Sequence, residues 1–426
     1  MNQSNMKVLV VGGGGREHAI VWKLAQSKNI AKLFCTPGNG GIAQIAECVP
    51  IQAIDIDGVV SFAKKENMDL VFVASDDPLA LGMVDALHQA GVQAFGPVKA
   101  AAIIEASKEY AKNFMKKYNI PTAAFAVFAD YDAAISYLQD SQFPIVVKAD
   151  GLALGKGAVI CASYEEAESA VRGMMCDDMF GKAGKRVVIE EYLQGSEVTV
   201  LAFADGKTVV PMVSSKDHKR AFDNDEGLNT GGMGAISPCR EYTDELAQTC
   251  MQQIYLPTIQ GLASEGRKFQ GVIYFEMMLT AQGPKVIEYN ARFGDPEAQI
   301  VLMRLKTDLL EIVQAIMEER LDEISIEWED GASACVVAAS GGYPLSYPKG
   351  MEISGLETFE STADDVVIFH AGTQMENGKY VTSGGRVLAV SAKGTDLEHA
   401  LAKAYEGIGR ISFEGMFYRS DIGKVK

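Results

Sequence analysis

The sequence has few of the features that direct a protein to nucleic acid or to a membrane. Its 39 Lys and Arg residues are outnumbered by 56 Asp and Glu residues, so the formal net charge is −17. A nucleic-acid surface needs clustered positive charge, and this balance argues against one. No uninterrupted apolar run approaches the roughly 18–20 residues of a membrane span, and the first ten residues lack the basic segment of a signal peptide. We therefore expect no nucleic-acid partner and no membrane association.

Cysteine is also sparse. The seven cysteines are odd in number and scattered, and no two form a Cys-x-x-Cys pair. This usage is typical of reduced proteins and argues against a disulfide framework or a cysteine zinc site. It predicts a cytoplasmic location. A monomeric state is compatible with this composition and cysteine usage.

The chain is long enough for several compact units. Its 426 residues, 48% of them hydrophobic, suit two to four domains with ordinary cores. In the first hundred residues apolar runs alternate with helical patterns, which predicts βαβ units and a parallel sheet. The expected strands are 7–11, 30–35 and 70–74, and the expected helices are 16–27, 57–66 and 79–90.

The rest of the chain is mixed α/β in pattern. One helix is expected over 100–118 as a connector, and another long one over 302–321. Beyond residue 331 short strands and turns dominate, with a helix at 397–404. Between these helices the expected strands are 145–148, 158–161, 187–191, 197–204 and 208–213, with a helix at 165–175.

The most informative segment runs from Lys285 to Glu297. It opens as a buried strand and then carries Glu288, Asn290 and Arg292 at alternate positions. Alternation along a strand predicts that the three side chains share one face. A carboxylate, an amide oxygen and a guanidinium suit a divalent cation and the phosphate oxygens that it bridges. The alternative is an exposed strand face with incidental charges, which the apolar neighbours disfavour. The segment therefore predicts a nucleotide phosphate and magnesium site.

Gly12–Gly15 has the form of a phosphate-binding turn, because it follows a strand and precedes a helix. It is a poor dinucleotide fingerprint, since Glu17 or His18 occupies the third glycine position and no acid follows the second strand. A merely tight turn from strand to helix is the alternative. Asn39, in a glycine-rich segment after the next strand, is expected at the same sheet edge.

A second glycine-rich loop spans residues 148–157 between two predicted strands. It is not a Walker loop, because no Gly-Lys-Ser or Gly-Lys-Thr opens a helix. A glycine hairpin carrying Lys148 and Lys156 could instead close over a triphosphate. Such hairpins are common, so the loop alone is a weak indication of triphosphate binding. Lys108 and Lys148 on its flanks strengthen this prediction.

Two further polar segments suit ligand binding. Glu190–Leu193 and Glu197 form an acidic hinge that could read an adenine edge and a ribose, although an ordinary strand end is the alternative. Residues 217–220 and 229–234 lie on one long polar stretch, and such stretches within compact enzymes are usually functional or disordered. His218 there need only bind phosphate.

Together these motifs resemble the ATP-grasp superfamily and, more narrowly, the phosphoribosylamine–glycine ligase family of purine biosynthesis. The resemblance covers essentially the whole chain in order. The segments that carry it are Gly14–His18, Pro37–Asn39, Phe95–Pro97, Ser107–Lys108, 148–153, Asp217–Arg220, Asn229–Ala235, Arg292–Glu297, His370–Thr373 and Gly384–Arg386.

The resemblance implies an α/β architecture in three parts. These are an N-terminal parallel βαβ, Rossmann-like substrate domain (1–100), an ATP-grasp region (101–325) with a lid at about 122–190, and a small β-rich C-terminal domain (331–426). The implied reaction is ATP-dependent ligation of glycine to 5-phosphoribosylamine through glycyl phosphate, with Mg²⁺ or Mn²⁺.

The resemblance also implies roles for individual residues. The catalytic residues are Lys148, Arg292 and Asp295. ATP would bind to Lys108, Lys148, Gly155, Lys156, Gly157, Glu190, Glu191, Tyr192, Leu193 and Glu197. Glycine and phosphoribosylamine would bind to Gly14, Gly15, Asn39, Asp217, His218, Lys219, Arg220, Thr230, Gly231, Gly232, Arg292 and Asp295. The metal would bind to Glu288 and Asn290, and the spacing of Glu276 with these two resembles the metal triad of the wider ATP-grasp superfamily.

Glu276 departs from the narrower family, which usually has a small residue there. The runs that end at Glu276 and at Glu288 are separated by a turn-rich link at 280–283, which predicts a hairpin. Antiparallel pairing then brings Glu276 opposite the Glu288–Asn290 face, with Phe275 and Met277 buried on the other side. The alternative is a solvated or misregistered glutamate.

Three other functions compete with this interpretation. A related ATP-grasp ligase or carboxylase with another acid substrate is the nearest, and the acid that stimulates ADP formation would separate the two. A nicotinamide-dependent oxidoreductase is disfavoured by Glu17 and His18. A nucleotide sensor without catalysis would show no sustained ATP turnover.

Overall fold

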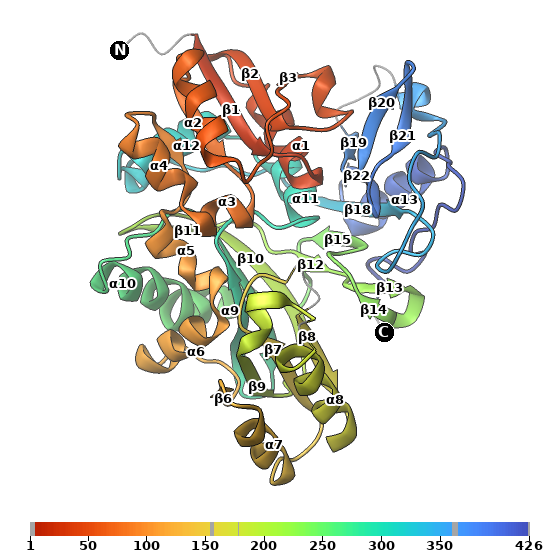
Figure 1. Cartoon of the computed structure of the whole chain (residues 1–426). Helices are drawn as coiled ribbons and strands as arrows, with labels where there is room; N and C mark the ends of the chain where they lie inside the picture. The colour runs from red at the N-terminus through yellow and green to blue at the C-terminus, as the bar shows by residue number, and fades with distance from the viewer. Residues whose placement is uncertain (1–4, 154–156, 178, 360–364, 425–426) are drawn as a thin grey trace.

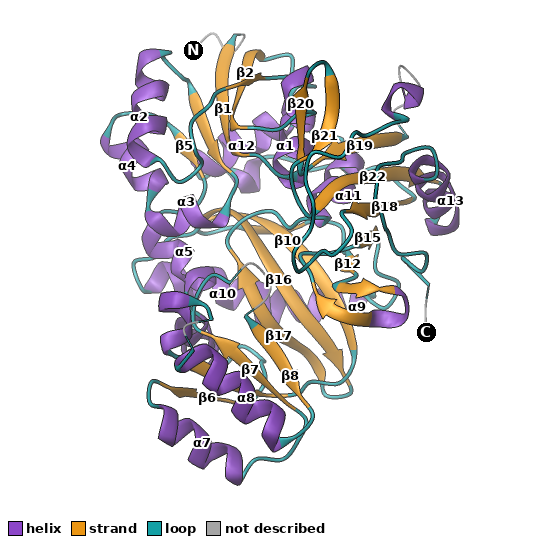
Figure 2. Ribbon diagram, turned by 45° about the vertical axis from the view of Figure 1, so that its right-hand side comes forward, coloured by secondary structure: helices purple, strands orange, loops and turns teal. Residues whose placement is uncertain are grey.

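A computed structural model describes residues 5–153, 157–177, 179–359 and 365–424. An N-terminal lobe, a lid lobe and a C-terminal lobe surround a central antiparallel sheet (Figures 1 and 2). Strand β10 (Ser196–Asp205) pairs with β11 (Val209–Pro211) and β16 (Gln270–Thr280), and β16 pairs with β17 (Gly283–Asn290). The mixed α/β class predicted from the sequence is confirmed.

The N-terminal lobe is the predicted parallel sheet. Its strand order is β3-β2-β1-β4-β5, and every pair in it is parallel. The strands are β1 (Met6–Gly12), β2 (Ile30–Pro37), β3 (Glu47–Cys48), β4 (Leu70–Val73) and β5 (Ala94–Phe95). The helices are α1 (Gly15–Leu24), α2 (Ile56–Lys65), α3 (Asp76–Leu81) and α4 (Met83–Gln89).

Several helices predicted as single are broken. The stretch 79–90 divides at Gly82, whose φ of +97° lies in the left-handed region that ends a helix. The connector 100–118 divides into α5 (Lys99–Ala106) and α6 (Lys108–Lys117). Ser107 is extended there, and its side chain accepts a hydrogen bond from the Tyr110 N–H as the cap of α6. Hydrophobic periodicity continues across such a cap, which is why the sequence pattern missed it.

The predicted helix 302–321 is likewise two helices. These are α11 (Glu297–Arg304) and α12 (Leu309–Met317). The Asp308 side chain accepts from the Leu310 N–H and begins α12. The Lys306 N–H donates to the Glu327 carbonyl in the connection between them, and this long-range contact is invisible to periodicity.

The lid lobe is a four-stranded antiparallel sheet with two packed helices. Its order is β6-β9-β7-β8, with α7 (Tyr131–Gln139) and α8 (Tyr164–Met175). Its strands are β6 (Phe125–Phe128), β7 (Ile145–Ala149), β8 (Ala158–Cys161) and β9 (Val187–Glu191). A hydrophobic cluster within the lobe, including Leu138, Val147 and Val171, forms its own core.

The C-terminal lobe takes two strands from the middle of the chain. Its sheet has the order β12-β15-β18-β22-β19, in which β12 (Lys216–Asp217) and β15 (Gly234–Ser237) belong to the long polar stretch. The others are β18 (Ala332–Ala339), β19 (Val366–His370) and β22 (Arg386–Gly394), with α13 (Leu397–Ile408) against them. The polar stretch is thus held against the C-terminal lobe at both of its ends.

The remaining elements are short or peripheral. Two small hairpins are β13 (Arg220–Phe222) with β14 (Glu226–Asn229), and β20 (Thr373–Glu376) with β21 (Lys379–Thr382). Helices α9 (Asp244–Cys250) and α10 (Leu256–Ser264) are joined by a π-helical turn. Within the described ranges no helix is long and apolar enough to cross a membrane. All seven cysteines are free thiols.

Two large hydrophobic clusters join the N-terminal lobe to the central sheet. One includes Leu9 of β1 and Phe275 of β16, and the other includes Val10 of β1 and Leu201 of β10. Neighbouring residues of β1 therefore face different clusters, as the alternation of a strand requires. The carboxyl ends of the parallel strands, where ligands bind in such sheets, are fixed relative to the central sheet.

Candidate active site

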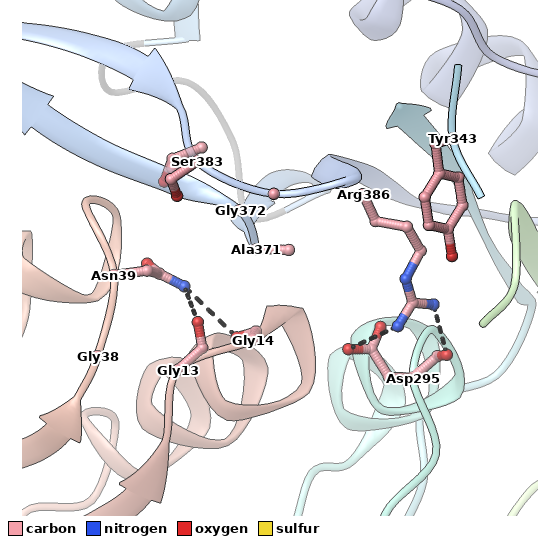
Figure 3. A pocket seen from close by; sticks show the side chains of 12 residues that line it. Gly13, Gly14, Gly38, Asn39, Asp295, Tyr343, Ala371, Gly372, Ser383 and Arg386 are labelled. Carbon is pink, nitrogen blue, oxygen red and sulfur yellow. Dashed lines mark hydrogen bonds and ion pairs between the residues drawn. The ribbon is translucent and has the colours of Figure 1, made fainter. Parts of the chain in front are cut away.

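A cavity of about 370 Å³ opens where the N-terminal lobe, the start of α11 and the C-terminal lobe meet (Figure 3). Gly13 and Gly14 line it from the turn after β1, and Asp295 lines it from the segment before α11. The C-terminal lobe contributes Tyr343 and Arg386, together with residues 371–373 and 383–384. The cavity is therefore lined by segments that lie far apart in the sequence.

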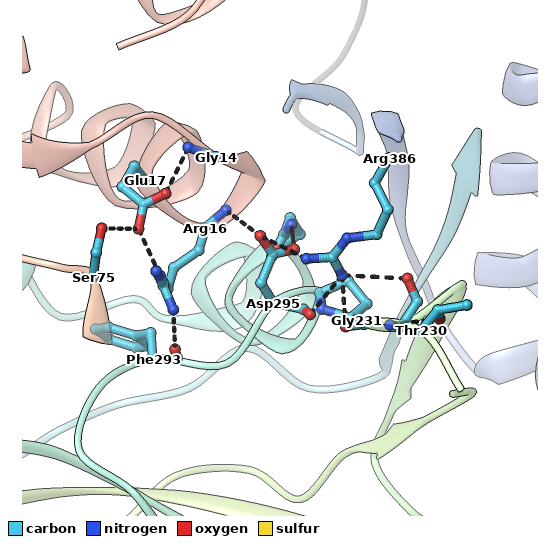
Figure 4. Close-up of polar contacts among 12 residues, drawn as sticks. Gly14, Arg16, Glu17, Ser75, Thr230, Gly231, Phe293, Asp295 and Arg386 are labelled. Atoms are coloured by element: carbon cyan, nitrogen blue, oxygen red, sulfur yellow. Dashed lines mark hydrogen bonds and ion pairs between the residues drawn. The ribbon is translucent and has the colours of Figure 1, made fainter. Parts of the chain in front are cut away.

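Protein carboxylates already occupy the amino end of α1 (Figure 4). The Gly14 N–H donates to Glu17 Oε2 at 2.6 Å, and the Arg16 N–H donates to Asp295 Oδ2 at 3.3 Å. A ligand phosphate would share this helix terminus with Asp295 rather than hold it alone. A Cβ at Gly15 would lie 2.5 Å from Gln299 Nε2, so a larger residue there would push this side chain away from its hydrogen bond to Asp295.

The side chain of Asn39 links two lobes by hydrogen bonds at the cavity wall. Its amide group donates to the Gly13 carbonyl at 3.0 Å and to the His370 carbonyl at 2.7 Å, while Oδ1 accepts from the Gly41 and Ile42 N–H groups. Asn39 therefore ties the N-terminal lobe to the C-terminal lobe beside the cavity, and its side-chain oxygen is already committed.

Arg386 holds together the other wall. Its Nη1 donates to the carbonyls of Gly231 at 2.6 Å and Asp295 at 2.7 Å, and its Nη2 pairs with Asp295 Oδ2 at 3.3 Å. The charges of Arg386 and Arg16 lower the pKa of the Asp295 carboxyl against the opposing effect of burial. Asp295 is thus an anion that joins α1, α11 and the C-terminal lobe.

A buried cluster of charges lies at the expected nucleotide site, where β7 and β9 face the central sheet. Lys148 and Lys112 both contact Glu190 Oε2, at 3.1 and 2.9 Å, and all three side chains are buried. Burial lowers the pKa of Lys112 to about 8. Glu190 Oε1 is buried without a hydrogen-bond partner in the described chain, so this carboxylate has one acceptor free.

The predicted hairpin and its register are confirmed. Glu276 of β16 lies opposite Glu288 of β17, and a bulge follows between Glu276 and Met277. Phe275 and Met277 are fully buried on the other side. Glu276 is itself only 3% exposed and pairs with Lys219, so it is neither solvated nor misregistered.

Glu288 faces several cations. Lys108 Nζ lies 3.4 Å from its Oε2. The charges of Lys108, Lys219 and Lys148 lower its pKa to about 2, although burial opposes them. Glu288 is therefore ionised at every physiological pH, as a ligand for a hard cation must be.

The expected alternation of Glu288, Asn290 and Arg292 on one strand is only partly correct. Strand β17 ends at Asn290, so Arg292 lies beyond it. The Arg292 side chain nevertheless lies beside that of Asn290, because its Nη2 donates to Asn290 Oδ1 at 3.0 Å. The same Nη2 lies 2.9 Å from Glu105 Oε1 on α5.

The polar stretch places its predicted residues in two directions. Lys219 points to Glu276, and Thr230 binds the Lys219 carbonyl at 2.8 Å. His218 Nε2 instead accepts from the Gly423 N–H at 3.1 Å, and burial lowers the pKa of His218 to about 4. Arg220 donates to the Gly227 carbonyl within its own hairpin. The side chains of His218 and Arg220 are therefore bound to other parts of the protein and do not face the nucleotide site.

The predicted hinge after β9 lies partly at the surface. Glu191 lies at the surface, where it accepts from the Ala124 N–H at 3.2 Å. Leu193 is buried, Tyr192 and Glu197 are half-buried, and Glu197 lies opposite Met278 in the central sheet. Gly157 is buried beside the glycine hairpin, whereas Gly155 and Lys156 lie outside the described residues.

Sequence reasoning missed several residues of this region. Glu105, Lys112, Glu297 and Tyr343 were not selected, and Arg386 was noted only as part of a motif. Glu105 lies on α5 and Lys112 on α6. The local sequence of each helix has no motif that predicts a binding residue. Glu297 was within reach of prediction, because it ends the segment Arg292–Glu297 that was already singled out.

A lid sheet and a central sheet that hold lysines and carboxylates between them, joined to a parallel N-terminal lobe, define the ATP-grasp class of proteins. The chain belongs to the phosphoribosylglycinamide synthetase family. Family models for its N domain, ATP-grasp (A) domain and C domain match residues 6–105, 106–298 and 333–425.

Relatives match over nearly the full chain. A phosphoribosylamine–glycine ligase of Clostridium acetobutylicum is 48% identical over 421 residues, 99% of this chain and all of that protein. One of Halalkalibacterium halodurans is 49% identical over 418 residues, covering 98% of this chain and 96% of the relative. The crystal structure of phosphoribosylamine–glycine ligase from Thermotoga maritima has a TM-score of 0.83 at 32% identity, covering 98% of this chain and 100% of that one. A biotin carboxylase from Campylobacter jejuni, at 15% identity and a TM-score of 0.75, covers 97% of this chain and 92% of its own and shares the fold alone.

Proposed function

We propose that this chain ligates glycine to 5-phosphoribosylamine with ATP, giving glycinamide ribonucleotide, ADP and phosphate in purine biosynthesis. The observation that carries the proposal is the adjacency of two sites. The Lys148–Glu190 cluster and the Glu276–Glu288 pair suit a nucleotide, and the glycine-lined cavity beside Asp295 suits a phosphorylated sugar. The family match supplies the substrates.

The reaction has two steps. The glycine carboxylate attacks the γ-phosphorus of ATP, the bond to the bridging oxygen breaks, and glycyl phosphate and ADP form. The amine of phosphoribosylamine then attacks the acyl carbon, an amide forms, phosphate leaves, and the amine gives up a proton. A carboxylate oxygen is a poor leaving group until it is phosphorylated, which is why ATP is consumed.

The role of the protein is to position charge. Lys148, Lys108 and Arg292 would offset negative charge on the phosphoryl group as it moves, and positioning of this kind accounts for most catalysis of phosphoryl transfer. No protein nucleophile takes part in this scheme. Asp295 would orient the amine substrate, since it joins α1 to Arg386 at the cavity wall.

The donor set suits a hard divalent cation, Mg²⁺ or Mn²⁺. Glu276 and Glu288 are opposite each other, Glu288 is ionised, and Asn290 adds an amide oxygen on the same strand. Lys219 and Lys108 pair with the two carboxylates here, and a cation bound between Glu276 and Glu288 would take the place of these ammonium groups. Bound there, the cation would neutralise phosphate oxygens of ATP. A cytoplasmic location and a monomeric state are part of the proposal.

One assay tests the proposal. ADP release should require glycine and freshly generated phosphoribosylamine together, and either one alone should give only background turnover. Alanine and formate serve as matched acids in place of glycine. Equal turnover with either acid would overturn the glycine assignment in favour of a related ATP-grasp ligase.

A further inference from the structure

Lys112 on α6 makes two buried contacts at the edge of the nucleotide site. Its side chain is buried, and its Nζ lies 2.9 Å from Glu190 Oε2 and donates to Thr122 Oγ1 at 2.8 Å. A buried ammonium group is costly unless it is both paired and hydrogen-bonded. Lys112 meets both conditions through these two partners, so its contacts fix where Glu190 and Thr122 lie.

These two partners lie at the two connections between the lid lobe and the rest of the protein. Thr122 lies just before β6, where the chain enters the lobe, and Glu190 lies in β9, the last strand before the chain leaves it. Thr122 is also bound to the central sheet, because its Oγ1 donates to the Val286 carbonyl at 2.7 Å and the Val286 N–H donates to the Pro121 carbonyl at 2.8 Å. One ammonium group, that of Lys112, therefore joins the entry and the exit of the lid lobe.

Glu190 connects Lys112 to Lys148. The Lys148 Nζ donates to the same oxygen, Glu190 Oε2, at 3.1 Å, and it lies 3.4 Å from the Ile287 carbonyl. Although burial opposes ionisation, the charges of Lys148 and Lys112 lower the pKa of Glu190. Because two ammonium groups share this one oxygen, Glu190 does not neutralise Lys148 alone. Lys148 therefore keeps its attraction for an anionic ligand.

Lys112 differs in exposure from Lys108, which lies one turn earlier on the same helix. Residues four apart share one face of a helix, and α6 thus directs Lys108 to Glu288 of the central sheet and Lys112 to Glu190 of the lid lobe. The Lys108 side chain is 20% exposed and that of Lys112 only 3%. The cavity that both lysines border has a volume of about 10 Å³, which is roughly the room for one water molecule. Lys112 is enclosed by protein and acts on a nucleotide only through its neighbours.

We propose that Lys112 is a positioning residue that holds Glu190 and, through it, the Lys148 ammonium group in place for the nucleotide, while it fixes the two connections of the lid lobe. This inference rests on the proposed function, in which the Lys148–Glu190 cluster binds ATP. Without Lys112 the Glu190 carboxylate would pair with Lys148 alone. The Lys148 ammonium group would then be less fixed in position and more fully neutralised, so nucleotide phosphate would compete with Glu190 for it.

The first experiment measures nucleotide binding by the full chain. Lys112→Met should raise the Kd for ADP in the presence of magnesium by about 10-fold, as is typical when the partner that orients a ligand-binding side chain is removed. Lys116→Met is the matched control, because Lys116 is an exposed lysine one turn further along α6, and it should leave the Kd unchanged. Isothermal titration calorimetry measures the three proteins, and circular dichroism checks their folding. A folded Lys112→Met protein with the Kd of the unaltered protein would overturn the proposal.

Steady-state kinetics separates this role from a general effect on the fold. In Lys112→Met the KM for ATP should rise about 10-fold, while the KM for glycine should change less than about threefold. Equal rises in both constants would indicate damage throughout the site and would overturn the proposal. If ADP release by the unaltered protein did not require glycine and phosphoribosylamine, the proposed function would be overturned instead. ADP binding would still test Lys112 in that case, so the two failures are distinguishable.

A double-variant cycle tests whether Lys112 acts through Lys148. In a Lys148→Ala background, Lys112→Met should change the Kd for ADP less than about twofold, because the side chain that it positions is absent. A loss as large as in the unaltered background would show that the two residues act independently and would overturn the proposal. Thr122→Val keeps every charge and removes one of the two Lys112 contacts, so it serves even if the double variant does not fold. It should raise the Kd about threefold, and an unchanged Kd would overturn the part of the proposal that concerns the lid connections.

Discussion

Glu105 on α5 holds Arg292 beyond the end of β17. Its Oε1 lies 2.9 Å from Arg292 Nη2, and its Oε2 accepts from the Ala291 N–H at 2.7 Å. One carboxylate thus fixes both the backbone and the guanidinium of the segment that leads to the active site. The helix that carries it connects the N-terminal lobe to the ATP-grasp region, so the position of Arg292 depends on how these two parts of the chain pack.

The first prediction concerns this contact. Glu105→Gln should lower kcat/KM by about 10- to 100-fold, because a buried guanidinium loses its carboxylate partner, while Glu105→Asp should recover part of the loss. The effect should fall mainly on kcat, measured by ADP release under saturating substrates. Glu109→Gln, which removes a surface pair with Arg186, is the control. A Glu105→Gln enzyme with normal kcat would show that Arg292 is held by other contacts.

The second prediction concerns the metal ligands. Glu276→Gln should raise the magnesium concentration needed for half-maximal rate, because one anionic oxygen becomes a neutral amide. Glu288→Gln should nearly abolish turnover, because Glu288 is the carboxylate on which the three lysine charges converge. Magnesium titrations of the steady-state rate test both. An unchanged magnesium dependence in Glu276→Gln would remove that residue from the metal site and leave only its ion pair with Lys219.

The third prediction concerns Lys148. Lys148→Ala should reduce kcat/KM on the order of 100-fold if the ammonium group contacts the transferring phosphate, as for loss of one transition-state donor. Lys285→Met is the control, because Lys285 pairs with the surface carboxylate of Glu191. Steady-state kinetics with ATP as the varied substrate compares them. Equal losses in the two variants would contradict a specific role for Lys148.

The fourth prediction is a pH dependence of stability. His18 and His370 are buried together, and the His370 N–H donates to His18 Nδ1 at 2.8 Å. Burial lowers the pKa of His18 to about 3 and that of His370 to about 4. The unfolded chain therefore binds protons that the folded chain does not, between pH 6.5 and about 4. This contribution to stability is complete above the unfolded pKa of about 6.5 and is lost as the pH falls.

Each histidine should cost on the order of 2 kcal/mol of stability at pH 5 relative to pH 8. The midpoint of urea-induced unfolding, measured across this range, should fall with decreasing pH. His18→Asn keeps an acceptor for the His370 N–H and removes one titrating group, so its midpoint should depend less on pH. The prediction fails if the unaltered protein and His18→Asn lose stability in parallel.

Several parts of this protein could be predicted from the sequence because their determinants are local. Strands β1, β2 and β4 follow from short apolar runs, and the glycine turn after β1 follows from its own residues. The hairpin that pairs Glu276 with Glu288 was predicted for the same reason, since register in a hairpin depends on the turn between the strands. The breaks at Ser107 and Asp308 escaped prediction, because a capping side chain can interrupt a helix without interrupting its hydrophobic pattern.

The assembly of the site depends on tertiary packing, which the sequence patterns did not reveal. Nothing in the sequence placed β12 and β15 in the C-terminal sheet, or turned His218 toward Gly423 and Lys219 toward Glu276. Glu105 contacts Arg292, and Arg386 contacts Asp295, across long separations in the chain, and such contacts depend on the packing of whole lobes. Periodicity and motifs therefore determined which elements form and which chemistry is present. The partners of each charge were decided by tertiary packing, because buried ions must find compensation wherever the fold brings it.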